Sequence, residues 1–303
     1  MFDILFLGTG ASIPSRDRSL PCVAVRQGRS ITLFDCGEGS QRQLMVSPFS
    51  FMKVDRIFIT HMHGDHILGL PGLLQTMGMS GRKNALSVFG PIGIDKALSG
   101  MLDACEGELE YELDVHELEG GESFSFDGFT VTSFSTVHNV PSVGYLYRED
   151  DKPGTFNREK AEKLGLEPGG DFASLQSGET VKGVRPEQVI GPAKPGRSMV
   201  YTGDTMPCSE VKEAAMNVDV LIHESTYIDE DSELANVHFH STAKSAAEIA
   251  AECEVGMLAL IHVSNRYGDA EVSLAEAKAY FENTIVPSDM QMLTVMNGDI
   301  RLQ

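Results

Sequence analysis

Apolar and polar positions alternate along much of the chain, and segments with helical apolar spacing separate the alternating runs. Alternation and β-branched content predict strands at residues 2–8, 22–26, 30–34, 55–60, 87–89, 108–117, 123–135, 142–147, 198–202, 218–223, 257–262 and 292–296. Apolar residues three and four apart predict helices at residues 41–45, 67–79, 93–104, 209–215, 241–252 and 274–282. Because both halves mix strands with helices, the chain is predicted to be an α/β protein in which two sheets pack together with helices outside.

Residues 148–197 interrupt this pattern. They are rich in glycine, proline and charge, and they contain one short amphipathic segment at residues 158–164. Nine Lys and Arg balance nine Asp and Glu there, whereas the whole chain has a net charge of −20. We therefore predict one domain over residues 1–303 with an inserted flexible arm at 148–197.

Composition limits the protein class. The 303 residues are 42% hydrophobic and 22% charged, which is ordinary for a globular protein. No apolar run is long enough to span a membrane, and no secretory signal is evident at the N-terminus, so a cytoplasmic protein is expected. Five scattered cysteines without a CxxC pair argue against disulfides and a thiolate zinc site. Taken alone, the acidic charge argues against a nucleic-acid partner.

The densest chemistry lies at residues 61–66, HMHGDH, between a predicted strand and a predicted helix. Period-2 geometry places His61 and His63 on one side, while Asp65 and His66 face a second point. One metal with a gap would satisfy this pattern, but two adjacent metals use the ligands better. Imidazole and carboxylate without thiolate favour zinc, with iron and manganese as competitors.

Three further candidate ligands follow predicted strands. His138 follows the strand that ends near residue 135, Asp204 follows residues 198–202, and His262 ends the strand at 257–262. Gly203 frees the backbone beside Asp204. A single histidine at a strand end is more often structural, but three such ends together with HMHGDH favour a metal site.

Several motifs resemble the metallo-β-lactamase fold and, within it, the tRNase Z (ribonuclease Z) family of tRNA 3′-end endonucleases. HMHGDH matches the HxHxDH motif of that superfamily, and the resemblance covers nearly the whole chain. Further family-like segments are Asp35-Cys36-Gly37-Glu38-Gly39, Gly203-Asp204-Thr205, His223-Glu224-Ser225-Thr226, His240-Ser241-Thr242 and His262-Val263-Ser264-Asn265-Arg266-Tyr267. The resemblance implies an αββα sandwich with a protruding exosite arm.

The resemblance also implies roles for individual residues. Two zinc ions per subunit would be held by His61, His63 and His138 on one side and by Asp65, His66 and His262 on the other, with Asp204 between them. Asp65 would accept a proton from the attacking water. The substrate would be precursor tRNA, and the protein would be a homodimer in which the arm of one subunit serves the site of the other.

Other site residues are predicted beside the ligands. His240 precedes a helix N-terminus, which suits a phosphate oxygen or protonation of the leaving 3′ oxygen, and Glu224 would orient it. Arg266 would hold a phosphate, although an ordinary ion pair explains it nearly as well. Gly170 and Leu175 fall where the exosite arm would contact tRNA. The chain departs from many relatives at Gly169-Gly170 and at Met206.

Three other functions fit parts of the sequence. A small-molecule phosphodiesterase would use the same metal motif, but it would have no use for an arm. A diiron redox protein of this fold usually carries a carboxylate where His63 stands. A catalytically silent RNA-binding module would not need the complete ligand set.

Overall fold

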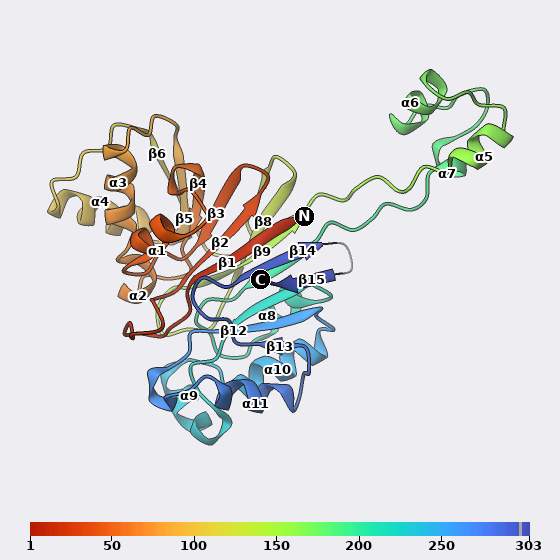
Figure 1. Ribbon diagram of the computed structural model, residues 1–303. Helices are drawn as coiled ribbons and strands as arrows, with labels where there is room; N and C mark the ends of the chain where they lie inside the picture. The colour runs from red at the N-terminus through yellow and green to blue at the C-terminus, as the bar shows by residue number, and fades with distance from the viewer. Residues whose placement is uncertain (297–298) are drawn as a thin grey trace. The chain divides into compact units, whose positions relative to one another are not determined.

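The computed structural model describes residues 1–296 and 299–303. It divides into two compact units, which are treated separately below. The first comprises residues 1–126, 130–147 and 197–303, and the second comprises residues 127–129 and 148–196. The first unit consists of two mixed β-sheets with helices outside them (Figure 1), as the α/β pattern predicts.

The first sheet has the strand order β15-β14-β1-β2-β3-β4-β5-β6 over the described residues. Its strands are β1 Phe2–Gly8, β2 Cys22–Gln27, β3 Ser30–Phe34, β4 Val54–Phe58, β5 Leu86–Pro91, β6 Leu113–Leu118, β14 Met292–Met296 and β15 Asp299–Leu302. Strands β3 to β6 run parallel, and β1, β2 and β14 pair antiparallel. All of β1 is buried, as expected of a strand covered on both faces.

The second sheet has the order β13-β12-β11-β10-β9-β8-β7. Its strands are β7 Ser123–Phe126, β8 Phe129–Ser135, β9 Val143–Glu149, β10 Ser198–Tyr201, β11 Val220–Glu224, β12 Met257–Ile261 and β13 Thr284–Ile285. Strands β10 to β13 run parallel. Their carboxyl ends therefore lie at one edge of the sheet.

Helices cover the outer face of each sheet (Figure 1). On the first sheet, β-strand residues such as Leu5 and Val88 pack with Leu74 and Leu98 of the helices. The helices of this side are α1 Ser40–Val46, α2 Gly64–Ile67, α3 Leu70–Met79 and α4 Ile94–Ala104. Those that follow β10 are α8 Ser209–Ala215, α9 Ser232–His238, α10 Ala243–Glu252 and α11 Glu271–Lys278. Short 3₁₀ turns are η1 Phe51–Lys53, η2 Asp229–Asp231 and η3 Asn265–Tyr267.

Aromatic rings fill the space between the sheets. The ring of Phe34 on β3 lies 5.6 Å from Phe58 on β4, 5.9 Å from Tyr145 on β9 and 5.7 Å from Tyr201 on β10. All four side chains are fully buried. Aromatic pairs at these distances add to the hydrophobic stabilisation of the interface. They also fix the two sheets against each other next to the strand ends.

Three sequence predictions of single elements were wrong. The helix expected at 67–79 is split into α2 and α3, because the ring of Pro71 would clash with the Ile67 carbonyl in a continuous helix. The strand expected at 123–135 is a hairpin, β7 and β8, that turns at Asp127-Gly128. The strand expected from residue 108 begins at Leu113, opposite the first residue of its partner β5. The helix expected at 241–252 is present as α10, with Thr242 as its N-cap, since the Thr242 side chain accepts a hydrogen bond from the Ser245 amide.

The second unit has a small core of its own. Sequence analysis predicted one amphipathic segment there, whereas the structure has α5 Arg158–Lys163, α6 Gly170–Gln176 and α7 Pro186–Val189. The core consists of Ala161, Leu166, Leu175, Val184 and Val189, all buried. Backbone bridges at Lys152–Lys194 and Phe156–Ile190 hold together the two chain segments that enter and leave this unit.

Candidate metal centre

Chemically active side chains follow the carboxyl ends of strands in both sheets. In the first sheet Asp35 follows β3, and His61 lies three residues after β4. In the second sheet Asp204 follows β10 and His262 follows β12. Parallel strands bring their carboxyl ends to the same edge, where α/β proteins commonly bind ligands. The two sheet edges together surround one site.

The structure brings together all seven predicted metal ligands. Their candidate ligand atoms fall into groups within 4.8 Å, namely His61, His63, His138 and Asp204 in one group and Asp65, His66 and His262 in another. Asp204 lies between the groups: one oxygen is 3.7 Å from His61 Nε2 and 3.4 Å from His262 Nε2, and the other is 3.5 Å from His66 Nε2. This geometry suits two adjacent cations with a shared carboxylate.

Asp35 orients two of these histidines. One of its oxygens, Oδ2, accepts a hydrogen bond from His66 Nδ1 at 2.7 Å. The Thr60 hydroxyl, 3.0 Å from both carboxylate oxygens, donates to Asp35 and so accepts from His61 Nδ1, also at 3.0 Å. With both Nδ1 atoms engaged, the Nε2 atoms point towards the ligand groups. Sequence analysis quoted Asp35 only as part of a motif and did not assign it this role.

Glu224 has the same arrangement on the second sheet. Its carboxylate accepts from His240 Nδ1 at 2.8 Å and from the Thr226 hydroxyl at 2.5 Å. Thr226 in turn accepts from His262 Nδ1 at 2.7 Å. One buried acid on each sheet therefore binds one histidine directly and a second one through a threonine. Sequence analysis quoted Thr226 only as part of a motif, and Thr60 carried no signal that it could have used.

Glu224 and His240 shift the pKa of each other. Burial opposes ionisation of Glu224, but the neighbouring His240 lowers the pKa of that carboxyl. Burial also opposes protonation of His240, yet Glu224, followed by Asp204, raises its pKa to about 9. His240 therefore holds its proton at neutral pH.

Asp65 is fixed by the N-terminal loop. Its Oδ2 accepts a hydrogen bond from the Ser12 amide at 2.9 Å and lies 3.4 Å from His262 Nε2. Burial would raise the pKa of Asp65, but the bond with His262 and the charge of His66 hold it below its usual range. Asp65 is thus an ionised carboxylate held in one orientation.

The residues fit a metal. Among the described residues, the buried atoms His66 Nε2 and Asp204 Oδ1 have no hydrogen-bond partner. His63 Nδ1 lies 3.1 Å from His61 Nε2 and 3.2 Å from His138 Nε2. Because His61 and His138 donate through Nδ1 to Thr60 and to the Phe239 carbonyl, their Nε2 lone pairs face His63. Lone pairs at this separation repel one another unless a cation or a proton lies between them.

The protonation states agree with this fit. Burial lowers the pKa of both His61 and His138, which favours neutral imidazole. Burial would raise the pKa of Asp204, but His262 and His66 hold it well below its usual range. His66 differs: burial opposes its charge, but Asp204 and Asp35 raise its pKa well above the usual value. Metal binding at His66 would therefore release a proton.

Backbone conformation at the strand ends is unusual. Asp35 (φ 57°) and His262 (φ 55°) both adopt the left-handed region, which non-glycine residues rarely enter. Gly203, at φ 60°, has no room for a side chain, because a Cβ atom would lie 2.6 Å from Thr60 Cβ. Strained conformations of this kind concentrate at functional sites, where the surroundings enforce them.

Sequence models of known families and several ribonuclease Z proteins match this chain. A sequence model described as Anti-Pycsar protein Apyc1 matches residues 2–151, and a model of the Beta-lactamase superfamily domain matches residues 174–263. Ribonuclease Z of Archaeoglobus fulgidus is 46% identical over 302 residues, covering 97% of this chain and 98% of the relative. Ribonuclease Z of Methanosarcina acetivorans is 43% identical over 300 residues, covering 97% and 98%. The chain belongs to the ribonuclease Z family.

Solved structures agree with this family membership. Human tRNase Z, short form, superposes with a TM-score of 0.72 at 28% identity, covering 97% of this chain and 99% of the human one. The metallo-beta-lactamase fold protein YhfI from Bacillus subtilis superposes with a TM-score of 0.70 at 18% identity, covering 96% and 98%. The predicted metallo-β-lactamase αββα sandwich is confirmed.

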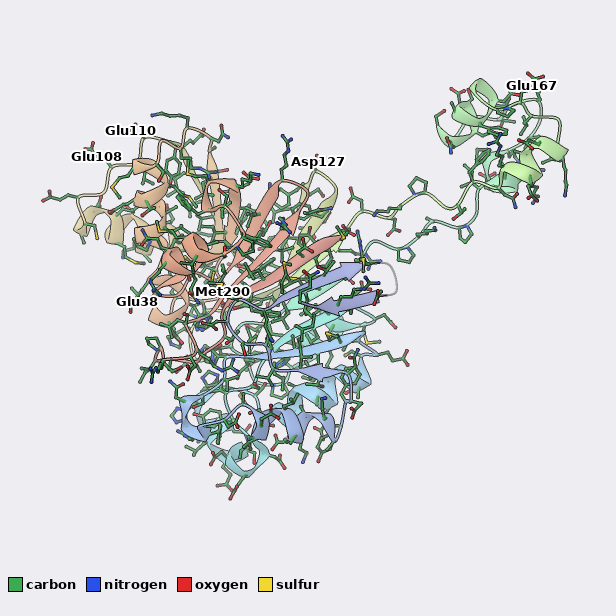
Figure 2. The ribbon with its side chains drawn as sticks, viewed as in Figure 1. Glu38, Glu108, Glu110, Asp127, Glu167 and Met290 are labelled. Carbon is green, nitrogen blue, oxygen red and sulfur yellow. The ribbon has the colours of Figure 1, made fainter. Side chains whose placement is uncertain are left out.

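In this ribonuclease Z family member, an open cleft of about 480 Å³ leads to the two groups of candidate metal ligands. It is lined by the predicted site residues His63, Asp65, Asp204 and His240 together with Ser12, Ile13, Pro14, Leu20, Glu38 and Leu68. Glu38 is labelled in Figure 2. Ile13, Pro14, Leu20 and Leu68 give the cleft apolar surface beside its charged and polar groups.

Three predicted substrate-binding residues are not among those that line this cleft. Arg266, in η3, has its guanidinium 5.1 Å from the Tyr227 ring centre and 3.9 Å from Asp231 Oδ2, so it has the ion-pair partner that the sequence left open. Gly170 is exposed at the start of α6 in the second unit. Leu175 is 0% exposed, so its side chain packs the core of that unit and does not face a substrate.

No helix of the described residues is long and apolar enough to cross a membrane.

Proposed function

We propose that the protein is a metal-dependent endoribonuclease that removes the 3′ trailer of precursor tRNA. The observation that carries this proposal is the convergence of seven imidazole and carboxylate ligands in a chain that matches ribonuclease Z relatives along its length. The reaction hydrolyses the phosphodiester that follows the discriminator base. The tRNA keeps a 3′-hydroxyl, and the trailer leaves with a 5′-phosphate.

Two zinc ions per subunit are the proposed cofactors. His61, His63 and His138 would hold one ion, Asp65, His66 and His262 would hold the other, and Asp204 would bridge them. Neutral imidazole with ionised carboxylate is the donor set that zinc prefers when thiolate is absent. Bound zinc would supply Lewis acidity. It would lower the pKa of the attacking water towards neutral and offset the negative charge of the phosphate.

Two side chains would move protons in this reaction. Asp65, held through Oδ2 by the Ser12 amide, would accept the proton of the attacking water. His240, held by Glu224 and protonated at neutral pH, would donate its proton to the O3′ of the tRNA as the P–O3′ bond breaks. Asp65 lies in α2, which follows strand β4 of the first sheet, whereas His240 lies between α9 and α10, so the two proton-moving groups come from different parts of the chain.

The second unit is the proposed tRNA-binding arm. Residues 148–197 are electrically neutral, so the remaining chain carries the whole charge of −20 and repels RNA more strongly. The basic residues of the arm include Arg158, Lys160 and Lys163 on α5. We propose a cytoplasmic homodimer in which the arm of one subunit presents tRNA to the cleft of the other.

A cleavage assay tests the activity. Zinc-loaded protein is incubated with a 3′-extended tRNA, the cut is mapped, and Asp65→Ala serves as the control. We expect a single cut after the discriminator base in the wild type and none with the variant. Equal cleavage by the variant, or random cuts along the RNA, would contradict the proposal.

An arm replacement separates tRNA cleavage from other hydrolysis. Residues 152 and 194 pair through a backbone bridge, so a short Gly-Ser turn can replace the residues between them. The shortened protein should hydrolyse a chromogenic phosphodiester normally and leave tRNA uncut. Loss of both activities would refute the role of the arm, and unchanged tRNA cleavage would favour a small-molecule phosphodiesterase.

Mixing variants tests the dimer. Arm-replaced subunits combined with intact-arm Asp65→Ala subunits should regain tRNA cleavage, because each supplies what the other lacks. Light scattering gives the oligomeric state. A monomer, or a mixture that stays inactive despite exchange of subunits, would contradict the shared site.

A further inference from the structure

Asp35 is saturated with hydrogen bonds. Its carboxylate receives the Thr60 amide at 2.7 Å, the Thr60 hydroxyl at 3.0 Å, His66 Nδ1 at 2.7 Å and the Tyr201 hydroxyl at 2.8 Å. A carboxylate offers about four lone-pair sites, so these donors fill it. Asp35 itself is 0% exposed, and no room is left for it to turn.

Tyr201 is the one of these donors that comes from the second sheet. It is the last residue of β10, it is fully buried, and its ring lies 5.7 Å from that of Phe34. Three residues later the same strand end carries Asp204. The hydroxyl of Tyr201 therefore joins the strand that supplies Asp204 to the acid that orients His66.

We propose that Tyr201 is a positioning residue of the metal centre. Its hydroxyl fixes the Asp35 carboxylate, which then fixes the Nδ1 proton and the ring orientation of His66 directly and those of His61 through Thr60. The Nε2 atoms of both rings are thereby aimed at the ligand groups from the first sheet while Asp204 approaches from the second. This inference deepens the proposed function and rests on its metal sites.

Removing the hydroxyl has a defined consequence. In Tyr201→Phe one acceptor site of the buried carboxylate loses its donor, and the bond between the two sheets at Asp35 is lost. Outer partners of metal-binding histidines typically contribute 10- to 100-fold to metal affinity. Because three donors to Asp35 remain, we expect the lower end, about a tenfold weaker binding of one zinc ion.

Tyr145→Phe is a matched control. Tyr145 is also fully buried, its ring lies 5.9 Å from Phe34, and its hydroxyl donates to the Ile59 carbonyl at 2.6 Å. The substitution removes the same atom from the same aromatic cluster without touching Asp35. Tyr147→Phe, whose hydroxyl bonds to Gln27, provides a second control.

The test measures zinc affinity in the full-length protein by competition with a chromogenic chelator. We expect one of the two dissociation constants to rise about tenfold in Tyr201→Phe and to stay within about twofold of wild type in both controls. As a second readout, the NMR signal of the His66 Nδ1 proton should shift in Tyr201→Phe alone. Equal zinc affinities and equal spectra in Tyr201→Phe and Tyr145→Phe would overturn the proposal.

A further measurement covers the case in which Tyr201→Phe fails to fold. In wild-type protein labelled with 3-fluorotyrosine, zinc titration should move the ¹⁹F signal of Tyr201 and leave that of Tyr147 unchanged. Equal responses of the two signals would overturn the inference.

Failure of the proposed function gives a different result from failure of this inference. A protein that binds two zinc ions but does not cut tRNA refutes the nuclease, whereas the role of Tyr201 is decided by zinc affinity and the NMR signals, which do not depend on cleavage.

Discussion

Replacing Glu224 by glutamine should move the high-pH limit of tRNA cleavage to a lower pH. Glu224 is fully buried and accepts from His240 Nδ1 at 2.8 Å. Its charge is the main reason why the pKa of His240 rises to about 9 despite burial. The variant keeps the size of the side chain but removes that charge, so His240 should lose its proton more easily.

The magnitude follows from the pKa. The pKa difference between about 9 and the ordinary histidine value of 6.5 corresponds to about 3 kcal/mol in favour of protonated His240. With a pKa of about 9, about 90% of His240 is protonated at pH 8. With a pKa of about 6.5, about 3% would be protonated. If His240 donates the proton, the rate at pH 8 should fall about 30-fold.

Single-turnover cleavage of a 3′-extended tRNA between pH 5.5 and pH 10 measures this effect. The wild-type rate should fall as pH rises through the pKa of His240, because a raised pKa keeps the proton on below that pH. The curve of Glu224→Gln should fall at a lower pH and approach the wild type towards pH 5.5. Both proteins are measured with the same zinc loading, so the difference between the two curves is the prediction.

Two controls make the outcome decisive. Zinc content must match the wild type, because Glu224 also holds His262 through Thr226. His240→Gln should be slow at every pH and lack the high-pH limit. If zinc-replete Glu224→Gln shows the wild-type pH limit, His240 is not the proton donor.

Three further predictions concern the arm, the backbone and the metal. Leu175→Ala removes a buried core side chain and should lower the stability of the second unit by about 2–3 kcal/mol. It should therefore slow tRNA cleavage and leave hydrolysis of a chromogenic phosphodiester unchanged, and equal loss of both rates would contradict this. Gly203→Ala forces a Cβ onto Thr60 at positive φ and should lower the melting temperature and zinc content together, whereas Gly170→Ala, at an open position, should change neither. Chelation should abolish cleavage and lower the melting temperature, and added zinc should restore both; a metal-stripped protein of unchanged stability would argue against these ligands.

Tertiary pairing accounts for one of the elements that sequence analysis placed wrongly. Residues 108–112 alternate as well as 113–117 do, but β6 can extend only as far as its partner β5, which starts at Leu86 opposite Leu113. The hairpin at 123–135 was within reach of sequence analysis, because Asp127-Gly128 is a strong turn signal. Leu175 was assigned to substrate binding, yet burial in the core of the second unit leaves its side chain no exposed surface.

The sequence by itself predicted which side chains form the candidate metal centre. HMHGDH is a local motif on a strand-to-helix connection, and His138, Asp204 and His262 stand at strand ends, so residue type and periodicity were enough to name them. Only the tertiary structure decided how these ligands are held. The bonds from Asp35 to His66 and Tyr201 join residues 31 and 166 positions apart, and no local pattern encodes such contacts. The pairing of Glu224 with His240 was expected from the sequence, and the structure gives its distance of 2.8 Å. Which buried acid meets which histidine is fixed by the packing of the two sheets against each other.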